Sequence, residues 1–274
     1  KVAGVSGPGN SPKTRSVLRV FLTGASSGIG AALACHYAGQ GAILGLVARR
    51  EGELQQLAAA VRTLGGEAVI YPLDVADAAA LVVAGKDFVT RFGAPDVVIA
   101  NAGVSAGTLT EHAEDLDVFR RIMETNVMGM VATFAPFIGP MRAGKDAGVG
   151  RRLVGIASVA GIRGLPGAEA YSASKAAVIS YLESLRLEMQ PFGIRVVTIA
   201  SGYIATPMTE INPYPMPFIL PADEAAKKFA AAIARGTSYT VIPWQMGVVA
   251  KLLRLMPNWL YDRLFVRAPR KPRL

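Results

Sequence analysis

The chain has 274 residues, of which 51% are hydrophobic and 18% charged, a composition that excludes a disordered polymer and allows a full core. Its single cysteine, Cys35, excludes an internal disulfide framework, and its two histidines lack ligand spacing, so no metal is expected. The net charge is +9, but seven cationic side chains against Asp262 place +6 of it in residues 251–274. The excess charge is a feature of the tail, and no nucleic-acid partner is expected.

Residues 1–16 are rich in Gly, Ser and Pro and lack the apolar core of a signal peptide, so we expect a flexible N-terminal arm. No run of about 18 apolar residues is free of charge, so no membrane-spanning helix is expected. These features predict a cytoplasmic protein, and the tail leaves association with a membrane surface open.

From residue 17 onward, short apolar runs alternate with segments of helical periodicity. Strands are predicted at 17–24, 41–49, 67–75, 94–103, 150–161 and 193–202, and helices at 28–39, 51–65, 77–93, 115–141 and 170–190. Strands that are apolar throughout are typical of a parallel sheet covered on both faces. We therefore predict an α/β fold with a doubly wound, Rossmann-like sheet. The expected division is one catalytic domain over 17–240, with a lid at about 207–222, and a C-terminal helical extension over 241–274.

The first predicted strand runs into the glycine-rich stretch TGASSGIG, residues 23–30. Glycines there allow a tight turn and a close approach of the backbone to a pyrophosphate, and the following helix offers free N–H groups and its positive dipole end. Its place between a strand and a helix favours a cofactor loop over an ordinary turn. The residues expected to contact the cofactor in this loop are Gly24, Ser26, Ser27, Gly28, Ile29 and Gly30.

The end of the second strand bears on which nucleotide is bound. An NAD site usually has an acidic side chain there, which holds the ribose 2′-hydroxyl. This chain has Arg49 and Arg50 instead, and two guanidinium groups suit a 2′-phosphate. Glu51 follows, but it should already belong to the next helix. NADP(H) is therefore expected in preference to NAD(H), although arginines that merely solvate a helix start would fit the same pattern.

Tyr171 and Lys175 stand four positions apart in YSASK, so they share one face of the predicted helix 170–190. A free tyrosine titrates near pH 10, and a neighbouring ammonium group lowers the pKa of a phenol. Such a pair suits proton transfer, but an idle surface pair has the same spacing.

The motifs around this pair resemble those of the classical short-chain dehydrogenase/reductase family over residues 17–206. TGASSGIG resembles the cofactor loop of that family, and the remaining matches follow in the family's order. They are Asp74 and Val75, the turn Asn101-Ala102-Gly103, Asn126 in TNVMG, Ser158 in IASVAG, Tyr171 and Lys175 in YSASK, and Ile204 and Thr206 in GYIAT.

The resemblance implies a role for each match. Asn126, Ser158, Tyr171 and Lys175 would form the catalytic tetrad. Tyr171 would exchange the proton, Ser158 would bond the substrate oxygen, and Lys175 would also hold the nicotinamide ribose. Asn126 would hold a water that links Lys175 to solvent. Asp74, Val75, Asn101, Ala102, Gly103, Ile204 and Thr206 would contact the cofactor.

Two positions depart from the family's pattern. Ala100 stands where the family often has a first asparagine before N-A-G, and Ser201 stands where a proline often precedes Gly202. Neither change touches the proton chemistry, although the second could loosen the loop around the nicotinamide.

Residues 207–221 hold five prolines and two methionines, and we expect a semi-rigid lid over an apolar carbonyl or alcohol. A lid that packs only on its own protein would fit as well. The tail has an amphipathic stretch at 244–256 and aromatic residues interleaved with basic ones. An interfacial membrane anchor, a subunit contact and a cleft wall all fit this tail.

The predicted function is an NADP(H)-dependent oxidoreductase that interconverts a carbonyl and an alcohol. The alternative is a catalytically silent nucleotide-binding regulatory or scaffold protein of the same fold, but the intact tetrad favours the enzyme. The resemblance also implies a homodimer or homotetramer, for which the helices at 115–141 and 170–190 could form the interface.

Overall fold

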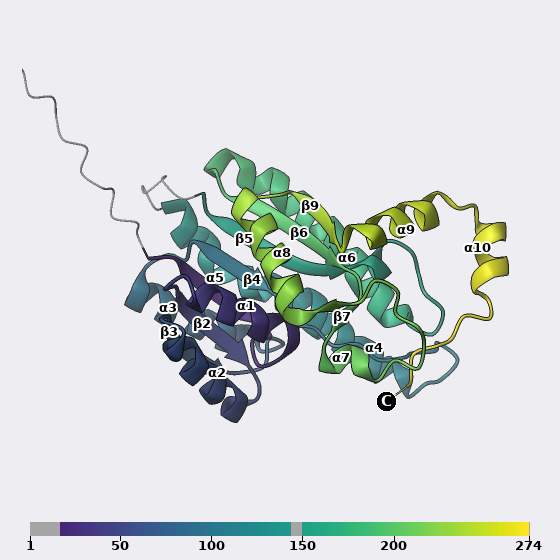
Figure 1. Cartoon of the computed structure of the whole chain (residues 1–274), viewed down its shortest axis with the longest axis horizontal. Coiled ribbons are helices and arrows are strands. Elements are labelled where there is room, and N and C mark those ends of the chain that lie inside the picture. The colour runs from purple at the N-terminus through teal and green to yellow at the C-terminus, as the bar shows by residue number, and fades with distance from the viewer. Residues whose placement is uncertain (1–16, 144–149, 274) are drawn as a thin grey trace, which may run out of the picture.

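The computed structural model of the chain describes residues 17–143 and 150–273 (Figure 1). The arm expected at 1–16 lies outside these described residues. The fold is built on a seven-stranded sheet whose neighbouring strands are all parallel, in the order β3-β2-β1-β4-β5-β6-β9. Its strands are β1 (Arg19–Thr23), β2 (Ile43–Ala48), β3 (Glu67–Pro72), β4 (Val97–Ala100), β5 (Arg152–Ser158), β6 (Arg195–Ser201) and β9 (Tyr239–Ile242).

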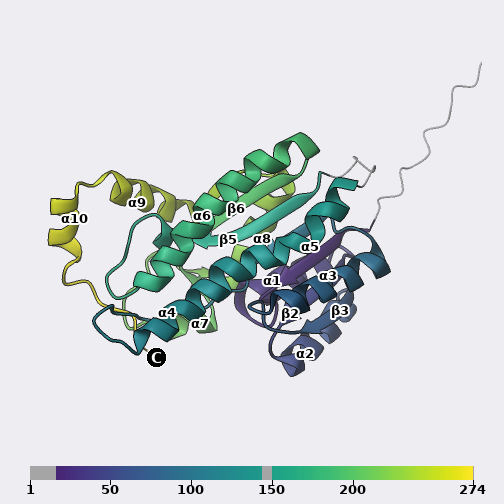
Figure 2. The ribbon, with the colours of Figure 1, turned by 180° about the vertical axis from the view of Figure 1, so that it is seen from behind.

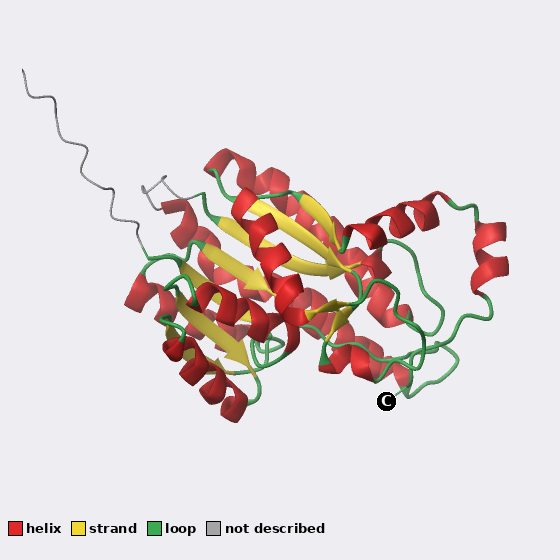
Figure 3. Cartoon of the chain, viewed as in Figure 1, coloured by secondary structure: helices red, strands yellow, loops and turns green. Residues whose placement is uncertain are grey.

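Helices cover both faces of this sheet (Figure 3). One face carries α1 (Gly28–Ala38), α2 (Glu51–Thr63) and α8 (Ala222–Arg235). The other face carries α3 (Ala78–Phe92), α5 (Gly129–Ala143) and α6 (Glu169–Met189), which are in front in Figure 2. The α/β fold with a doubly wound, Rossmann-like sheet is confirmed.

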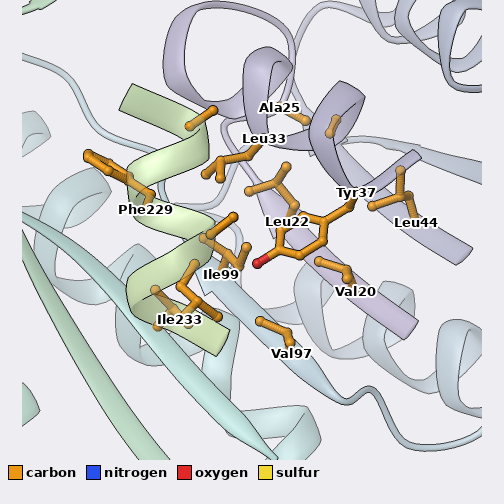
Figure 4. Close-up of a cluster of buried hydrophobic side chains, with 14 of the residues drawn as sticks. Val20, Leu22, Ala25, Leu33, Tyr37, Leu44, Val97, Ile99, Phe229 and Ile233 are labelled. Carbon is orange, nitrogen blue, oxygen red and sulfur yellow. The ribbon is translucent and has the colours of Figure 1, made fainter. Parts of the chain in front are cut away.

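The two faces give two hydrophobic cores, and β1 contributes to both because successive strand residues point to opposite sides. Val20 and Leu22 pack with Leu33 of α1 and Phe229 of α8 (Figure 4). Phe21, between them in the sequence, packs in the opposite core, which includes the phenylalanines of α3 and α5. This double burial explains why the strands are apolar at every position.

The order of the strands creates the crevice that holds the site. The chain moves outward from β1 through β2 to β3, and then returns to place β4 on the other side of β1. The loops after β1 and β4 therefore leave the sheet in opposite directions. A topological switch point of this kind is where ligands bind in open parallel sheets, beyond the carboxyl ends of the strands.

The structure corrects the single helix expected at 115–141. It consists of α4 (Asp115–Met123), one π-helical turn (Glu124–Met128) and α5. The π turn includes Asn126, whose side chain bonds the backbone of the loop after β4, and π-bulges of this kind occur often at functional sites. Periodicity alone does not reveal such a turn.

Helix α8 and edge strand β9 were not predicted from the sequence. α8 has an apolar stripe that includes Ala225, Phe229 and Ile233, so its helical period was present in the sequence. β9 ends at Ile242, so the sheet continues two residues past the boundary expected at 240. The extension that follows consists of α9 (Trp244–Leu255), α10 (Asn258–Phe265) and the segment 266–273.

Candidate active site

A pocket of about 260 Å³ lies at the switch point, beyond the carboxyl ends of β1, β2, β4, β5 and β6. Most of the residues predicted to contact a cofactor line it. They are Gly24, Ser26, Ser27, Gly28, Ile29, Arg49, Arg50, Asp74, Val75, Asn101, Ala102, Gly103, Tyr171, Lys175 and Thr206. Gly30 and Ile204 are buried behind this lining.

The glycine loop takes a shape that requires glycine. Gly24 and Gly28 have φ angles of 66° and 55°, in the left-handed region. A Cβ on Gly24 would meet Ala102 Cα at 2.7 Å, and a Cβ on Gly30 would collide with the Gly24 carbonyl oxygen. The first and third glycines therefore allow the turn, the loop after β4 and helix α1 to pack closely together.

Asn101 holds the loops after β1 and β4 together across the switch point. Its side-chain nitrogen donates to the carbonyl oxygens of Thr23, at 3.2 Å, and Gly24, at 3.0 Å. The Asn101 backbone N–H also donates to Thr23 Oγ1, at 3.2 Å. The turn Asn101-Ala102-Gly103 is thus fixed against the glycine loop.

Helix α1 begins at this loop with an uncapped N-terminus. Ser27 is its N-cap residue but makes no side-chain capping bond, so N–H groups of the first turn lack that partner. The glycines of the preceding turn place no side chain between this terminus and the pocket. Free N–H groups in this position suit a pyrophosphate.

The two arginines after β2 lie at the rim of the pocket. The Arg50 guanidinium donates to the hydroxyls of Ser26, at 3.2 Å, and Ser27, at 3.3 Å, and pairs with Glu53 at 2.6 Å. Arg49 stands 3.7 Å from the carboxylate of Asp74. Glu51 belongs to α2, as expected. Guanidinium and hydroxyl groups gathered here would suit an anionic group on a bound nucleotide.

Lys175 lies deep beside the pocket, with its side-chain nitrogen donating to the Ile156 carbonyl oxygen at 2.9 Å. The Lys175 nitrogen is 5.7 Å from the ring centre of Tyr171, so the two residues share one helix face as predicted. The side chain of Ser158 lies close enough to the Tyr171 hydroxyl to favour the ionised form of that hydroxyl. Ser158 ends β5, and its Oγ also accepts from the Ala160 backbone N–H at 3.2 Å.

Burial controls the ionisation of this group. It lowers the pKa of Lys175 to about 8, and it raises the pKa of Tyr171, an effect that the Ser158 side chain opposes. The Tyr171 shift is opposite in direction to the one predicted from the spacing of the pair. The reason is that the phenol is enclosed by protein and the ammonium lies some distance from it, so desolvation outweighs attraction.

Asn126 is fully buried and joins the loop after β4 to helix α6. Its Oδ1 accepts from the Val104 backbone N–H at 2.8 Å, while its Nδ2 donates to the Val104 carbonyl oxygen and to Ser174 Oγ, each at 3.0 Å. A Cβ on Gly103 would lie 3.3 Å from Asn126 Oδ1 and 3.6 Å from Lys175 Nζ. The absence of a side chain at Gly103 keeps these two groups close.

The lid expected at 207–222 follows Thr206 and begins with the short helix α7 (Pro207–Glu210). It returns through β8 (Leu220–Pro221), which pairs with β7 (Ile204–Ala205). Tyr214 of the lid packs edge-on against Tyr203, with ring centres 6.5 Å apart. Of this segment, Pro207 and Met208 line the pocket.

The C-terminal extension makes polar contacts with two segments beside the site, one after β5 and one after β4. On the side after Ser158, Arg163 donates to the carbonyl oxygens of Leu253 and Met256 and lies over the ring of Tyr261. On the side after β4, Arg273 forms hydrogen-bonded ion pairs with Glu114 and the buried Asp115.

The sequence did not predict these contacts of the C-terminal extension, nor several residues that line the pocket. Ser174 stands within YSASK but was given no role. Arg163 and Arg273 belong to no motif, and only the cluster of cations in the tail could have drawn attention to Arg273. The pocket lining not predicted comprises Ala48, Leu73, Val104, Thr125, Ile156, Ala157, Ser201, Pro207 and Met208.

A parallel sheet of this order, with its pocket at the switch point and a glycine loop before α1, is typical of dinucleotide-binding proteins. The family model for short chain dehydrogenase matches residues 19–213, and the chain belongs to the short-chain dehydrogenase/reductase family. It is therefore an oxidoreductase that acts with a nicotinamide cofactor on a carbonyl or hydroxyl group of a small molecule.

Individual relatives agree with this assignment. The chain is 36% identical over 242 residues to an uncharacterized oxidoreductase of Myxococcus xanthus, covering 88% of this chain and 94% of the relative. It is 34% identical over 256 residues to 11-beta-hydroxysteroid dehydrogenase-like 2 of Arabidopsis thaliana, covering 90% and 81%. A solved short-chain type dehydrogenase/reductase from Mycobacterium marinum superposes with a TM-score of 0.73 at 28% identity, covering 82% and 93%.

Proposed function

We propose that the enzyme uses NADP(H) to interconvert a carbonyl and an alcohol on an apolar small molecule. The observation that carries the cofactor preference is the pair Arg49 and Arg50 at the rim, where an acidic residue would be needed for the ribose 2′-hydroxyl of NAD. Asp74, the nearby carboxylate, faces Arg49. In this proposal Arg49 and Arg50 bind the 2′-phosphate, and Asp74 and Val75 contact the adenine.

The rest of the cofactor follows the geometry of the pocket. The glycine loop and the start of α1 would hold the pyrophosphate, Lys175 would bond the nicotinamide ribose, and Ile204 and Thr206 would contact the carboxamide. The nicotinamide supplies the hydride to the carbonyl carbon in reduction and accepts it in oxidation.

Side chains of the protein donate and accept the proton. In reduction, the Tyr171 hydroxyl donates its proton to the carbonyl oxygen as that oxygen gains negative charge. The hydroxyl of Ser158, which lies beside that of Tyr171, would donate to the same oxygen and stabilise the charge. Because burial keeps Tyr171 protonated, the proton is in place before the substrate arrives.

Lys175 and Asn126 support this transfer from behind the tyrosine. A protonated Lys175 stabilises the phenolate left after transfer, and its pKa of about 8 lets it change charge close to neutral pH. Asn126 Oδ1 accepts one bond from Val104 and keeps a lone pair for the water that would connect Lys175 to solvent.

The preference for an apolar substrate rests on the lid. Tyr203 and Tyr214 are half-buried, and burial raises the pKa of each. Met208, at the start of the lid, lines the pocket itself. The 11-beta-hydroxysteroid dehydrogenase-like name of one relative is consistent with an apolar substrate of this kind.

A panel of carbonyl compounds tests the proposal, with NADPH and NADH oxidation followed for each. Steroid-like, lipid-like and aromatic ketones should be turned over with NADPH. A panel in which small polar sugars react best would contradict the apolar substrate. A protein that binds NADPH but oxidises it with none of the panel would favour the silent nucleotide-binding alternative.

A further inference from the structure

Helix α9 is apolar on two opposite faces. Met246 and Ala250 face inward and are buried, and Met246 approaches Gly202 after β6. The outward stripe follows the helical spacing i, i+4, i+8, i+11 and is exposed. It consists of Trp244 (71% exposed), Val248 (48%), Leu252 (61%) and Leu255 (81%). A helix that is apolar all round normally has both faces covered, so the outer stripe needs a partner.

Helix α10 continues this exposed surface. Trp259, Leu264 and Val266 are exposed, whereas Tyr261 is buried and stacks on Phe265. Figures 1 and 2 show, from opposite sides, that α9 and α10 project from the body of the molecule. Because α9 starts directly after β9, it leaves the same edge of the sheet as the pocket. We call Trp244, Val248, Leu252, Leu255, Trp259 and Leu264 the outer apolar face.

Free positive charge accompanies the outer apolar face. Residues 244–273 hold seven cationic side chains and one acidic residue, Asp262. Arg254 bonds the Ile162 carbonyl oxygen, and Lys271 and Arg273 bond the loop after β4. Within 244–273, the exposed cations for which neither an ion pair nor a side-chain hydrogen bond to another described residue is seen are Lys251, Arg263, Arg267 and Arg270.

The combination of apolar and cationic groups favours a lipid surface over a second copy of the chain as the binding partner of the outer apolar face. A two-fold contact joins the same surface of two copies, so both sides of the contact would carry the flanking cations with only Asp262 to balance them, and like charges oppose such a contact. An anionic bilayer surface accommodates both kinds of group. Aliphatic side chains enter the acyl boundary, tryptophans lie at the headgroups, and cations reach the phosphates.

We propose that residues 244–267 bind the enzyme to the surface of an anionic lipid bilayer through the outer apolar face and its flanking cations. The helices would lie in the plane of the surface, because α9 is only about 18 Å long at 1.5 Å per residue. Among the described residues, no helix is long and apolar enough to cross a membrane.

Vesicle flotation of the full-length chain tests this proposal. The protein should float with vesicles of phosphatidylcholine mixed with phosphatidylserine, remain unbound to phosphatidylcholine alone, and be released by high salt. No flotation with the mixed vesicles at low salt would overturn the proposal. Equal flotation with both vesicle types would overturn the role of the cations.

Two sets of variants separate the apolar and the charged contributions. Trp244→Ser/Leu255→Ser/Trp259→Ser should abolish flotation, and the matched control Leu64→Ser/Val83→Ser/Leu187→Ser, which removes exposed apolar residues elsewhere, should not. Lys251→Gln/Arg263→Gln/Arg267→Gln should weaken binding about a hundredfold, at roughly fivefold per cation. Its control, Lys86→Gln/Arg121→Gln/Lys227→Gln, lowers the net charge equally and should float like the wild type.

The same serine variant distinguishes lipid from a second copy. Its activity in solution and its sedimentation coefficient should match those of the wild type, because no subunit contact is lost. A shift of the serine variant to a smaller species would identify the outer apolar face as a subunit interface and contradict the proposal.

Discussion

At the scale of single residues, the site depends on where charged groups lose water. Lys175 is 5% exposed, which lowers its pKa to about 8, while Tyr171 beside it keeps its proton. Arg49 and Arg50 remain at the solvent-facing rim, where they can meet a phosphate without a large desolvation cost. In the proposed mechanism, buried groups hold the proton and exposed groups select the nucleotide.

The buried lysine makes stability depend on pH. The pKa of Lys175 is about 8 in the folded chain against an ordinary value of 10.5, so between these values the unfolded chain binds more protons. Stability therefore rises with pH from about 8 to about 10 through this group, and below pH 8 the full penalty of a buried charge remains. Thermal unfolding across this range should show the gap between Lys175→Met and the wild type narrowing as pH rises. A constant gap would show that Lys175 is not strongly desolvated.

The rim arginines should affect NADPH and NADH differently. Arg50→Ala removes a guanidinium group that can donate to a phosphate, and hydrogen bonds to charged groups contribute about 1.5–3 kcal/mol, less at an exposed position. We expect isothermal titration to show a loss of about tenfold in NADPH affinity and little change for NADH. Arg62→Ala, an exposed arginine on α2 outside the pocket, is the control. Equal losses for both cofactors would argue that Arg50 acts on the loop rather than on the 2′-phosphate.

At the scale of elements, the site is made where loops from distant parts of the chain meet. Asn101 fixes the loop after β4 to the glycine loop, and Asn126 fixes it to α6. The alternation of strands and helices, the glycine loop and the Tyr171–Lys175 face were all predictable, because each follows from local periodicity or spacing. The π turn at Asn126 and the tail contacts of Arg163 and Arg273 were not, because they depend on contacts between residues up to 159 positions apart.

The glycine turn offers a local test of this assembly. Gly28→Ala places a Cβ 2.9 Å from Thr206 Cγ2 at a φ of +55°, so it should reduce cofactor affinity and destabilise the fold by about 1 kcal/mol. Gly52→Ala on α2 meets nothing within 4 Å and should leave both properties unchanged or slightly raise stability. Calorimetry and cofactor titration of the two variants give the comparison. Cofactor affinity unchanged in Gly28→Ala would mean that this turn does not contact the nucleotide.

At the scale of the whole molecule, the C-terminal extension connects the two sides of the site. Arg163 holds it beside the segment after Ser158, and Arg273 holds its end against Asp115. Arg273 keeps the pKa of Asp115 below its ordinary value, so the ion pair persists at neutral pH and weakens only as strong acid protonates the carboxylate.

Loss of the contact between Arg273 and Asp115 should be measurable by amide hydrogen exchange. Arg273→Ala leaves Asp115 without its guanidinium partner, so amides of residues 104–115 should exchange several-fold faster than in the wild type. Arg267→Ala, which removes an exposed arginine of the same segment, should leave the exchange of 104–115 unchanged. If both variants exchange alike, the ion pair does not restrain the loop.

The central claim is that Tyr171 donates the proton in an NADP(H)-dependent reduction. The most direct measurement is the rate of NADPH oxidation by Tyr171→Phe with the best carbonyl of the panel, together with the affinity of this variant for NADPH. The account predicts a rate lower by about a hundredfold to ten-thousandfold with NADPH affinity close to that of the wild type. A near wild-type rate with intact NADPH binding would contradict it.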